Sequence, residues 1–221
     1  YGPLLVLAAH PDDETIGCGA TLARFAHEGE PVVVWFATDG VTSRESQPQS
    51  PEERWESALR ANELLGVQDV VKERFPDNRL DEVARLDICR AMQAIIDRVK
   101  PSTVLTHSAA DLNVDHRLVG ECAAVVSRPL PNSSVQRVLH FEIPSSTGWF
   151  ANAGRGFEPT AFIDVSEYLQ IKLLALREYG PEIPGAPHAR SASSLEALAR
   201  WRGNSVGRNA AEAFEVSQMI L

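Results

Sequence analysis

The chain has 221 residues, of which 44% are hydrophobic and 23% are charged, so its composition is that of an average globular protein. These values exclude a disordered tail protein, a collagen, a coiled coil and a disulfide-stapled miniprotein. The 30 acidic residues against 21 lysines and arginines give a formal net charge of −9, which disfavours nucleic acid as a partner.

Short apolar runs alternate with helical patterns through the first half of the chain. In chain order we expect strand 3–9, helix 15–28, strand 31–38, helix 51–65, strand 70–75, helix 80–99 and strand 102–106. Gly29 and Gly66 stand where the first two helices should end, because glycine readily takes the left-handed conformation that closes a helix. Pro51 is typical of the first position of a helix.

The same alternation continues in the second half, where the predicted elements are helix 116–127, strands 135–143 and 160–165, helices 167–179, 195–202 and 207–213, and strand 215–220. Alternating strands and helices predict an α/β fold, with a Rossmann-like and mostly parallel sheet covered by helices on both faces. We expect a single domain, with a core over about residues 1–143 and a smaller C-terminal cap over about residues 144–221.

The apolar runs and the cysteines bear on the location of the protein. The longest apolar runs are much shorter than the roughly 20 residues that span a bilayer, so no membrane span is expected. Cys18, Cys89 and Cys122 are odd in number and widely spaced, which favours reduced thiols over a disulfide framework. We therefore expect a cytoplasmic protein without a signal peptide or lipid anchor.

Two polar loops follow the strands expected over residues 3–9 and 102–106, and both carry metal-type ligands. The first reads His10-Pro11-Asp12-Asp13-Glu14, and the second reads Asp111-Leu112-Asn113-Val114-Asp115-His116. Ligands of an open α/β sheet bind outside the carboxyl ends of the strands, which is where these loops lie. Two imidazoles and one carboxylate meet the count of protein ligands in a catalytic zinc site.

A purely structural explanation of these loops is also open, because aspartate and asparagine are common in turns and at helix N-termini. Asp12 or Asp13 could cap the first helix, and Asp115 could cap the helix expected from residue 116. Three consecutive acids after a buried strand are harder to explain in this way, since their charges repel one another and a cation would neutralise them.

Beyond the loop chemistry, the sequence resembles a known family. Ala9-His10-Pro11-Asp12-Asp13-Glu14, followed by Gly17-Cys18-Gly19, strongly resembles the signature of the LmbE-like, or PIG-L, N-acetylglucosamine deacetylases. Asp115-His116 resembles the second metal motif of that family. The likeness spans most of the chain, since it also includes Arg54 twelve residues before Gly66, Phe75-Pro76-Asp77 and Ala211-Glu212-Ala213-Phe214.

The resemblance implies a function and a set of roles. His10, Asp13 and His116 would bind one Zn²⁺ per chain, although other divalent metals are possible. Asp12 would be the general base, and Arg54 would help to hold the sugar or its attached group. The implied reaction removes the N-acetyl group from a small-molecule amino-sugar conjugate and releases acetate and a free amine. The family also implies a possible homo-oligomer.

The sequence departs from the family pattern at Asn113, where several members carry a histidine that is thought to stabilise the oxyanion. An asparagine amide donates a hydrogen bond but cannot be a cation, so we expect Asn113 to contact the substrate with help from another donor. His188 is the candidate for that donor. We expect Asp115 and His107 to orient the metal ligands from behind.

Several alternatives remain open from the sequence. Gly17-Cys18-Gly19 is similar to part of a dinucleotide-binding fingerprint, but Leu22 stands at the third glycine position, so close helix–strand packing is the expected role. The protein could also hydrolyse another amide or a phosphoester, or could be a catalytically idle carbohydrate-binding subunit. Asp12 argues against the idle binder, because binding alone does not need a second carboxylate beside the water.

Overall fold

The computed structural model describes residues 2–43, 49–149 and 156–220. Within these residues the strands form one sheet in the order β3-β2-β1-β4-β5-β7-β6. They are β1 (Leu4–Ala8), β2 (Val32–Phe36), β3 (Asp69–Lys72), β4 (Thr103–His107), β5 (Arg137–Phe141), β6 (Ala161–Asp164) and β7 (Ala211–Met219). Strands β1 to β5 are parallel, and β7 is antiparallel to both of its neighbours. The predicted α/β fold with a mostly parallel sheet is therefore confirmed.

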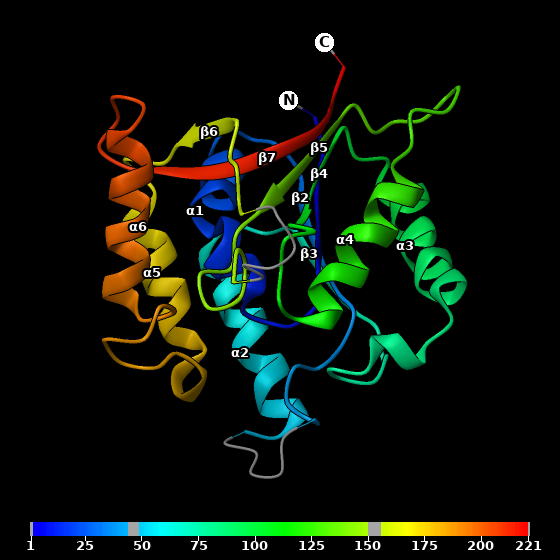
Figure 1. Ribbon diagram of the computed structural model, residues 1–221, viewed down its shortest axis with the longest axis horizontal. Helices are drawn as coiled ribbons and strands as arrows, with labels where there is room; N and C mark the ends of the chain where they lie inside the picture. Colours follow the sequence, from blue (N-terminus) through cyan, green and yellow to red (C-terminus); the bar gives the residue numbers. More distant parts are fainter. Residues whose placement is uncertain (1, 44–48, 150–155, 221) are drawn as a thin grey trace.

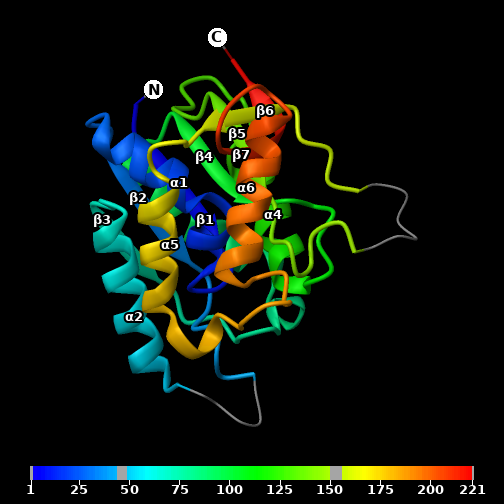
Figure 2. The same cartoon turned by 90° about the vertical axis from the view of Figure 1, so that its left-hand side faces the viewer.

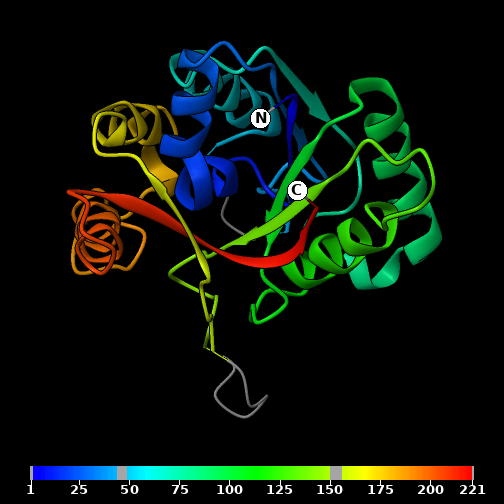
Figure 3. The same ribbon diagram turned by 90° about the horizontal axis from the view of Figure 1, so that it is seen from above.

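Helices cover both faces of the sheet (Figure 1 and Figure 3). They are α1 (Asp13–His27), α2 (Pro51–Leu64), α3 (Arg85–Val99), α4 (Val114–Val126), α5 (Leu169–Glu178) and α6 (Ala192–Asn204), with short 3₁₀ turns η1 (Leu80–Glu82) and η2 (Gly180–Glu182). Helices α1, α2, α5 and α6 lie on one side, and α3 and α4 lie on the other. In the described part of the chain no helix combines the length and apolar character that crossing a bilayer requires.

Strand β1 supplies side chains to both hydrophobic cores. Leu4 and Val6 pack in the cluster beneath α1, α2 and α5, whereas Leu5 and Leu7 pack in the cluster beneath α3 and α4. Since successive strand residues point to opposite faces and both faces are covered, the whole strand is apolar. This burial explains why the strand reads as a continuous apolar run.

Two of the predicted helices are corrected by the structure. The predicted helix 207–213 is wrong, because residues from Ala211 onward form β7, which pairs with β5 and β6. The helix propensity of this alanine-rich segment is overridden by pairing in the sheet and by burial of Ala211–Phe214. The predicted helix 80–99 is divided into η1 and α3.

The C-terminal elements extend the same sheet rather than standing apart from it. Strand β7 pairs with β5 along Arg137–Phe141, and β6 pairs with β7 at the edge of the sheet. Helix α5 packs beside α1 and α2, and α6 lies next to α5 (Figure 2). The last part of the chain therefore contributes directly to the environment of α1.

The strand order places a crevice at the carboxyl ends of β1 and β4. From β1 the sheet extends toward one edge through β2 and β3, and toward the other edge through β4 and β5. Ligand sites of open α/β sheets lie where the strand order reverses in this way. The loops that follow β1 and β4 carry both polar motifs of the sequence, and the structure brings them together at this point.

Candidate metal centre

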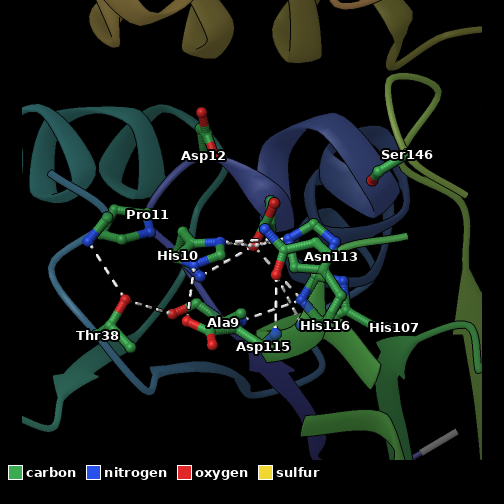
Figure 4. Close-up of polar contacts among 12 residues, drawn as sticks. Ala9, His10, Pro11, Asp12, Thr38, His107, Asn113, Asp115, His116 and Ser146 are labelled. Atoms are coloured by element: carbon green, nitrogen blue, oxygen red, sulfur yellow. Dashed lines mark hydrogen bonds and ion pairs between the residues drawn. The ribbon is translucent and has the colours of Figure 1, made fainter. Parts of the chain in front are cut away.

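Three side-chain atoms from the two loops form a small triangle at the carboxyl edge of the sheet (Figure 4). His10 Nδ1 lies 3.2 Å from His116 Nε2 and 3.2 Å from Asp13 Oδ2, and His116 Nε2 lies 3.3 Å from Asp13 Oδ2. All three residues are buried. The sequence-predicted ligand set is thus brought together by the fold, although His10 and His116 are more than 100 residues apart.

The size of this triangle fits a divalent metal ion. Ligand atoms at 2.0–2.2 Å from a tetrahedral zinc ion are about 3.3–3.6 Å apart, and the three distances here are near the lower end of this range. A set of two neutral imidazoles and one carboxylate is a donor set that zinc favours. Three protein ligands would also leave a fourth tetrahedral position open for water or substrate. The residues present therefore fit the metal that the family resemblance implies.

Carboxylates hold the far sides of both histidine rings. His10 Nε2 lies 3.2 Å from Asp115 Oδ2 and 3.4 Å from Asp77 Oδ1, and His116 Nδ1 lies 3.1 Å from Asp111 Oδ1. A carboxylate behind a ligating histidine fixes the ring orientation and its tautomer. Asp115 is itself fixed because it accepts hydrogen bonds from the backbone amides of Asn78 and Leu80.

His107, at the end of β4, packs behind the same centre. Its ring stacks on that of His116 with centroids 4.1 Å apart, and its Nε2 accepts a hydrogen bond of 3.0 Å from the amide of Ala9. Burial lowers the pKa of His107 to about 4, so the ring is neutral near pH 7. A neutral, stacked imidazole supports His116 without adding a charge to the site.

Asp12 lies next to the triangle but takes no part in it. Its backbone has φ 120° and ψ −27°, a conformation that costs a residue with a side chain about 1–3 kcal/mol. Although Asp12 is the N-cap residue of α1, its carboxylate makes no capping hydrogen bond. In Figure 4 this carboxylate stands apart from the network of dashed contacts. Helix capping therefore does not explain Asp12.

Two arginines from distant parts of the chain approach the Asp12 carboxylate. Arg54 Nη2 lies 2.8 Å from Asp12 Oδ2, and Arg190 Nη1 lies 3.6 Å from the same oxygen. Arg54 also donates to the carbonyl of Pro11, and its guanidinium lies over the ring of Tyr179. Burial raises the pKa of Asp12 from its ordinary value, and the positive charge of Arg54 opposes this rise.

Glu14 supports the backbone of Asp12 from the interior. Its carboxylate is fully buried and accepts hydrogen bonds from the Asp12 amide at 3.0 Å and from the Tyr179 hydroxyl at 2.5 Å. Thr15 and Asn62 also donate hydrogen bonds to this carboxylate. Burial raises the pKa of Glu14 to about 6. Glu14 thus anchors the strained turn on which Asp12 stands.

A cavity of about 210 Å³ opens over these residues. Its lining consists mainly of polar side chains and includes His10, Asp12, Asp13, Gly40, Arg54, Asn78, Asn113, His116, Ile143, Ser145, Ser146 and Arg190. The three residues of the metal triangle and Asp12 all line this same space. A ligand in the cavity would therefore meet both.

The other sequence-predicted substrate contacts are placed differently. Asn113 lines the cavity, but its side-chain Oδ1 caps α4 by accepting from the amides of Asp115 and His116, and its Nδ2 donates to Asn78 Oδ1. His188 is exposed, does not line the cavity, and accepts a hydrogen bond of 3.1 Å from the amide of Arg190. A contact of either residue with substrate stays a prediction.

Sequence reasoning missed Arg190, although this residue lies two positions after His188 in the same loop. It also assigned no role to Asp77 and Asp111, which were visible in the motif Phe75-Pro76-Asp77 and in the second loop. Their positions behind the histidines depend on how distant loops meet. No local pattern announces such contacts.

The comparison with protein families identifies the chain. The model for PIG-L, GlcNAc-PI de-N-acetylase, matches residues 5–127, which is more than half of the chain. The chain belongs to the PIG-L family. The matched segment includes both metal-ligand loops and Arg54, whereas Arg190 and the strand β7 lie beyond it.

Individual proteins also resemble the chain over most of its length. Uncharacterized deacetylase YaiS of Escherichia coli (strain K12) is 31% identical over 182 residues, covering 80% of this chain and 89% of that protein. Diacetylchitobiose deacetylase of Thermococcus kodakarensis is 26% identical over 221 residues, covering 95% and 80%. The structure of the conserved protein TT1542 from Thermus thermophilus superimposes with a TM-score of 0.79 and 26% identity, covering 100% and 97%.

Proposed function

We propose that this protein is a zinc-dependent N-deacetylase, which hydrolyses the N-acetyl group of an N-acetylglucosamine-type amino sugar or its conjugate. The observation that carries the proposal is the shared cavity. The ligand triangle of His10, Asp13 and His116 and the uncoordinated carboxylate of Asp12 face the same space of about 210 Å³. Amide hydrolysis needs both an electrophilic centre for the carbonyl oxygen and a base for the water.

The roles of the side chains follow from these positions. His10, Asp13 and His116 would hold a divalent ion, which would supply a Lewis acid for the acetyl carbonyl. Asp12 accepts the proton of the attacking water as the new C–O bond forms. The same carboxyl then gives this proton to the nitrogen as the C–N bond breaks, so that acetate and a free amine leave. Arg54 favours the ionised form of Asp12 that the first step requires.

The walls of the cavity suit a hydroxylated ligand. Asn78, Ser145 and Ser146 offer uncharged donors and acceptors, and Arg190 adds a guanidinium whose side chain is 25% exposed. These groups match the hydroxyl and acetamido oxygens of an amino sugar. The name of the Thermococcus kodakarensis relative, diacetylchitobiose deacetylase, supports the same substrate class.

The resemblance to the family also supports a homo-oligomer, which light scattering would test.

Acetate release tests the proposal directly. The protein is stripped of metal with a chelator and reconstituted with Zn²⁺, and acetate is measured with N-acetylglucosamine and N,N′-diacetylchitobiose as substrates. We expect acetate only from the zinc-loaded protein. The matched control is D12N, which should retain the metal but lose most turnover.

Other outcomes of this assay point to other functions. Sugar binding by calorimetry without acetate release would indicate an idle carbohydrate-binding subunit. Hydrolysis of p-nitrophenyl phosphate but not of acetylated sugars would indicate a phosphoesterase. Either result would overturn the deacetylase proposal.

A further inference from the structure

Helix α1, which begins with the metal-ligating Asp13, is not a continuous helix. Cys18 has φ −147° and ψ 16°, which is outside the helical region, so the helix consists of a first segment before Cys18 and a second segment after it. A break of this kind frees backbone groups that a continuous helix would pair with each other. Those groups are buried here and need partners from elsewhere.

Two charged side chains supply these partners. In a continuous helix the amide of Ala20 would donate to the carbonyl of Ile16. Here the Ala20 amide donates to Glu212 Oε1 at 3.2 Å, and the Ile16 carbonyl accepts from Lys172 Nζ at 2.7 Å. The amide of Thr21 donates to the other oxygen of Glu212 at 2.7 Å. Glu212 thus caps the second segment, and Lys172 closes the first.

The two charged groups also bind each other. Lys172 Nζ lies 2.6 Å from Glu212 Oε1, and the two residues are 3% and 4% exposed. Lys172 is on α5 and Glu212 is on β7, so elements far along the chain meet at the break in α1. A buried ion pair is costly to desolvate, and a hydrophobic pair of similar volume would often be as stable. Fold stability alone therefore does not account for this pair.

The path of the first segment is also set by packing. A Cβ atom on Gly17 would lie 2.3 Å from a ring carbon of Phe141 on β5, so only glycine allows this close approach. The close helix–strand packing expected for Gly17-Cys18-Gly19 is confirmed at Gly17. With Gly17 pressed against the sheet and Ile16 held by Lys172, the first segment has a fixed direction.

We propose that Lys172 and Glu212 are positioning residues of the metal centre. By hydrogen-bonding to the backbone on both sides of the break in α1, they fix the direction of the first segment. They thereby fix the position of the Asp12–Asp13 turn relative to His10 and His116. This inference gives a role to Ala211-Glu212-Ala213-Phe214, the C-terminal motif that the catalytic groups leave unexplained. It rests on the metal site of the proposed function, but not on the reaction catalysed there.

The test compares E212Q and K172M with M92A. The glutamine of E212Q keeps the shape of the side chain but has a single acceptor oxygen, and the methionine of K172M keeps most of the volume without the charge. Met92 is fully buried in the other core cluster, beneath α3 and α4, so M92A destabilises the fold without touching the break. All proteins are studied at a temperature at which circular dichroism shows them folded.

The first readout is the Zn²⁺ dissociation constant, measured by competition with a chromogenic chelator. We expect E212Q and K172M to bind Zn²⁺ about 10–100-fold more weakly than wild type, as is usual when groups that orient ligands are lost. M92A should bind Zn²⁺ as wild type does. Wild-type affinity in both folded variants would overturn the proposal, because the pair would then serve stability alone.

The second readout is the labelling rate of Cys18 by N-ethylmaleimide, followed by peptide mass spectrometry on the metal-free proteins. Cys18 is buried at the break, so it reports local opening there. We expect faster Cys18 labelling in E212Q and K172M than in M92A at matched global stability. Equal labelling rates in these variants and in M92A would contradict a role of Lys172 and Glu212 in holding the break, even if one variant bound zinc poorly. Neither readout needs turnover, so failure of the proposed deacetylase activity would leave this inference standing.

Discussion

The site has two halves, a metal-ligand half of His10, Asp13 and His116 and an Asp12 half of Asp12, Arg54 and Arg190. They differ in how completely hydrogen bonds and ion pairs fix their side chains. His10 and His116 each have a carboxylate behind the ring nitrogen that points away from the triangle, and Asp13 also accepts from the amide of His10 at 2.9 Å. On the other half, Asp12 has a strained backbone, and Nε of Arg190 has no hydrogen-bond partner among the residues that the structure describes.

This difference separates two tasks. A metal site needs ligands that are already oriented, because reorganising them weakens binding. A site for substrate and proton transfer keeps donors and acceptors free until the substrate arrives. Substitutions on each half test whether metal binding and turnover are separable in this way.

The largest effect is expected from H116A on the metal-ligand half. This change removes one of three protein ligands and leaves Asp111 without the ring that it faces. We expect loss of stoichiometric zinc and of all measurable acetate release, with the far-ultraviolet circular dichroism spectrum retained. Elemental analysis after gel filtration measures the metal. Full zinc occupancy in H116A would remove this histidine from the ligand set.

On the Asp12 half, D12N should separate metal binding from turnover. The amide has nearly the same shape as the carboxylate but cannot accept the proton of the attacking water. We expect kcat to fall by about 10²–10⁴-fold, the range that general acid–base catalysis contributes, while zinc content stays at the wild-type level. Near-normal kcat would show that Asp12 is not the base.

The fold was largely predictable because its signals are local. Buried strands such as β1 read as continuous apolar runs, and Gly29 and Gly66 mark helix ends. The error at residues 207–213 arose where non-local pairing with β5 and β6 decides the structure. The break at Cys18 was not predicted, because the side chains that bind the backbone on its two sides, Lys172 and Glu212, lie more than 150 residues later.

The two halves of the site differ in predictability for the same reason. His10, Asp13 and His116 stand in, or at the helix starts after, the loops that follow β1 and β4, so topology brings them to one edge of the sheet. Arg190 comes from the loop before α6, and its approach to Asp12 depends on how the C-terminal helices pack. A sequence pattern specifies which residues follow a strand, but not which distant loop covers them.

R190Q should have an intermediate effect that is confined to the Asp12 half. The side chain lines the cavity and lies 3.6 Å from Asp12, but it is neither a metal ligand nor the base. We expect KM for N,N′-diacetylchitobiose to rise about 10–100-fold, the loss typical of one charged hydrogen bond, with kcat changed less and zinc content unchanged. Loss of zinc in R190Q would show that Arg190 also supports metal binding, and that the two halves of the site are not separate.

The smallest effect is expected from H188A, which tests how far the Asp12 half extends along its loop. If His188 contacts the substrate, as the sequence predicts, H188A will raise KM as much as R190Q does. His188 is exposed and accepts a hydrogen bond from the Arg190 amide. We therefore expect a smaller rise in KM. The double variant H188A/R190Q decides between the two readings. Independent substrate contacts would give additive losses, whereas a histidine that acts only by holding Arg190 in place would add nothing once Arg190 is replaced.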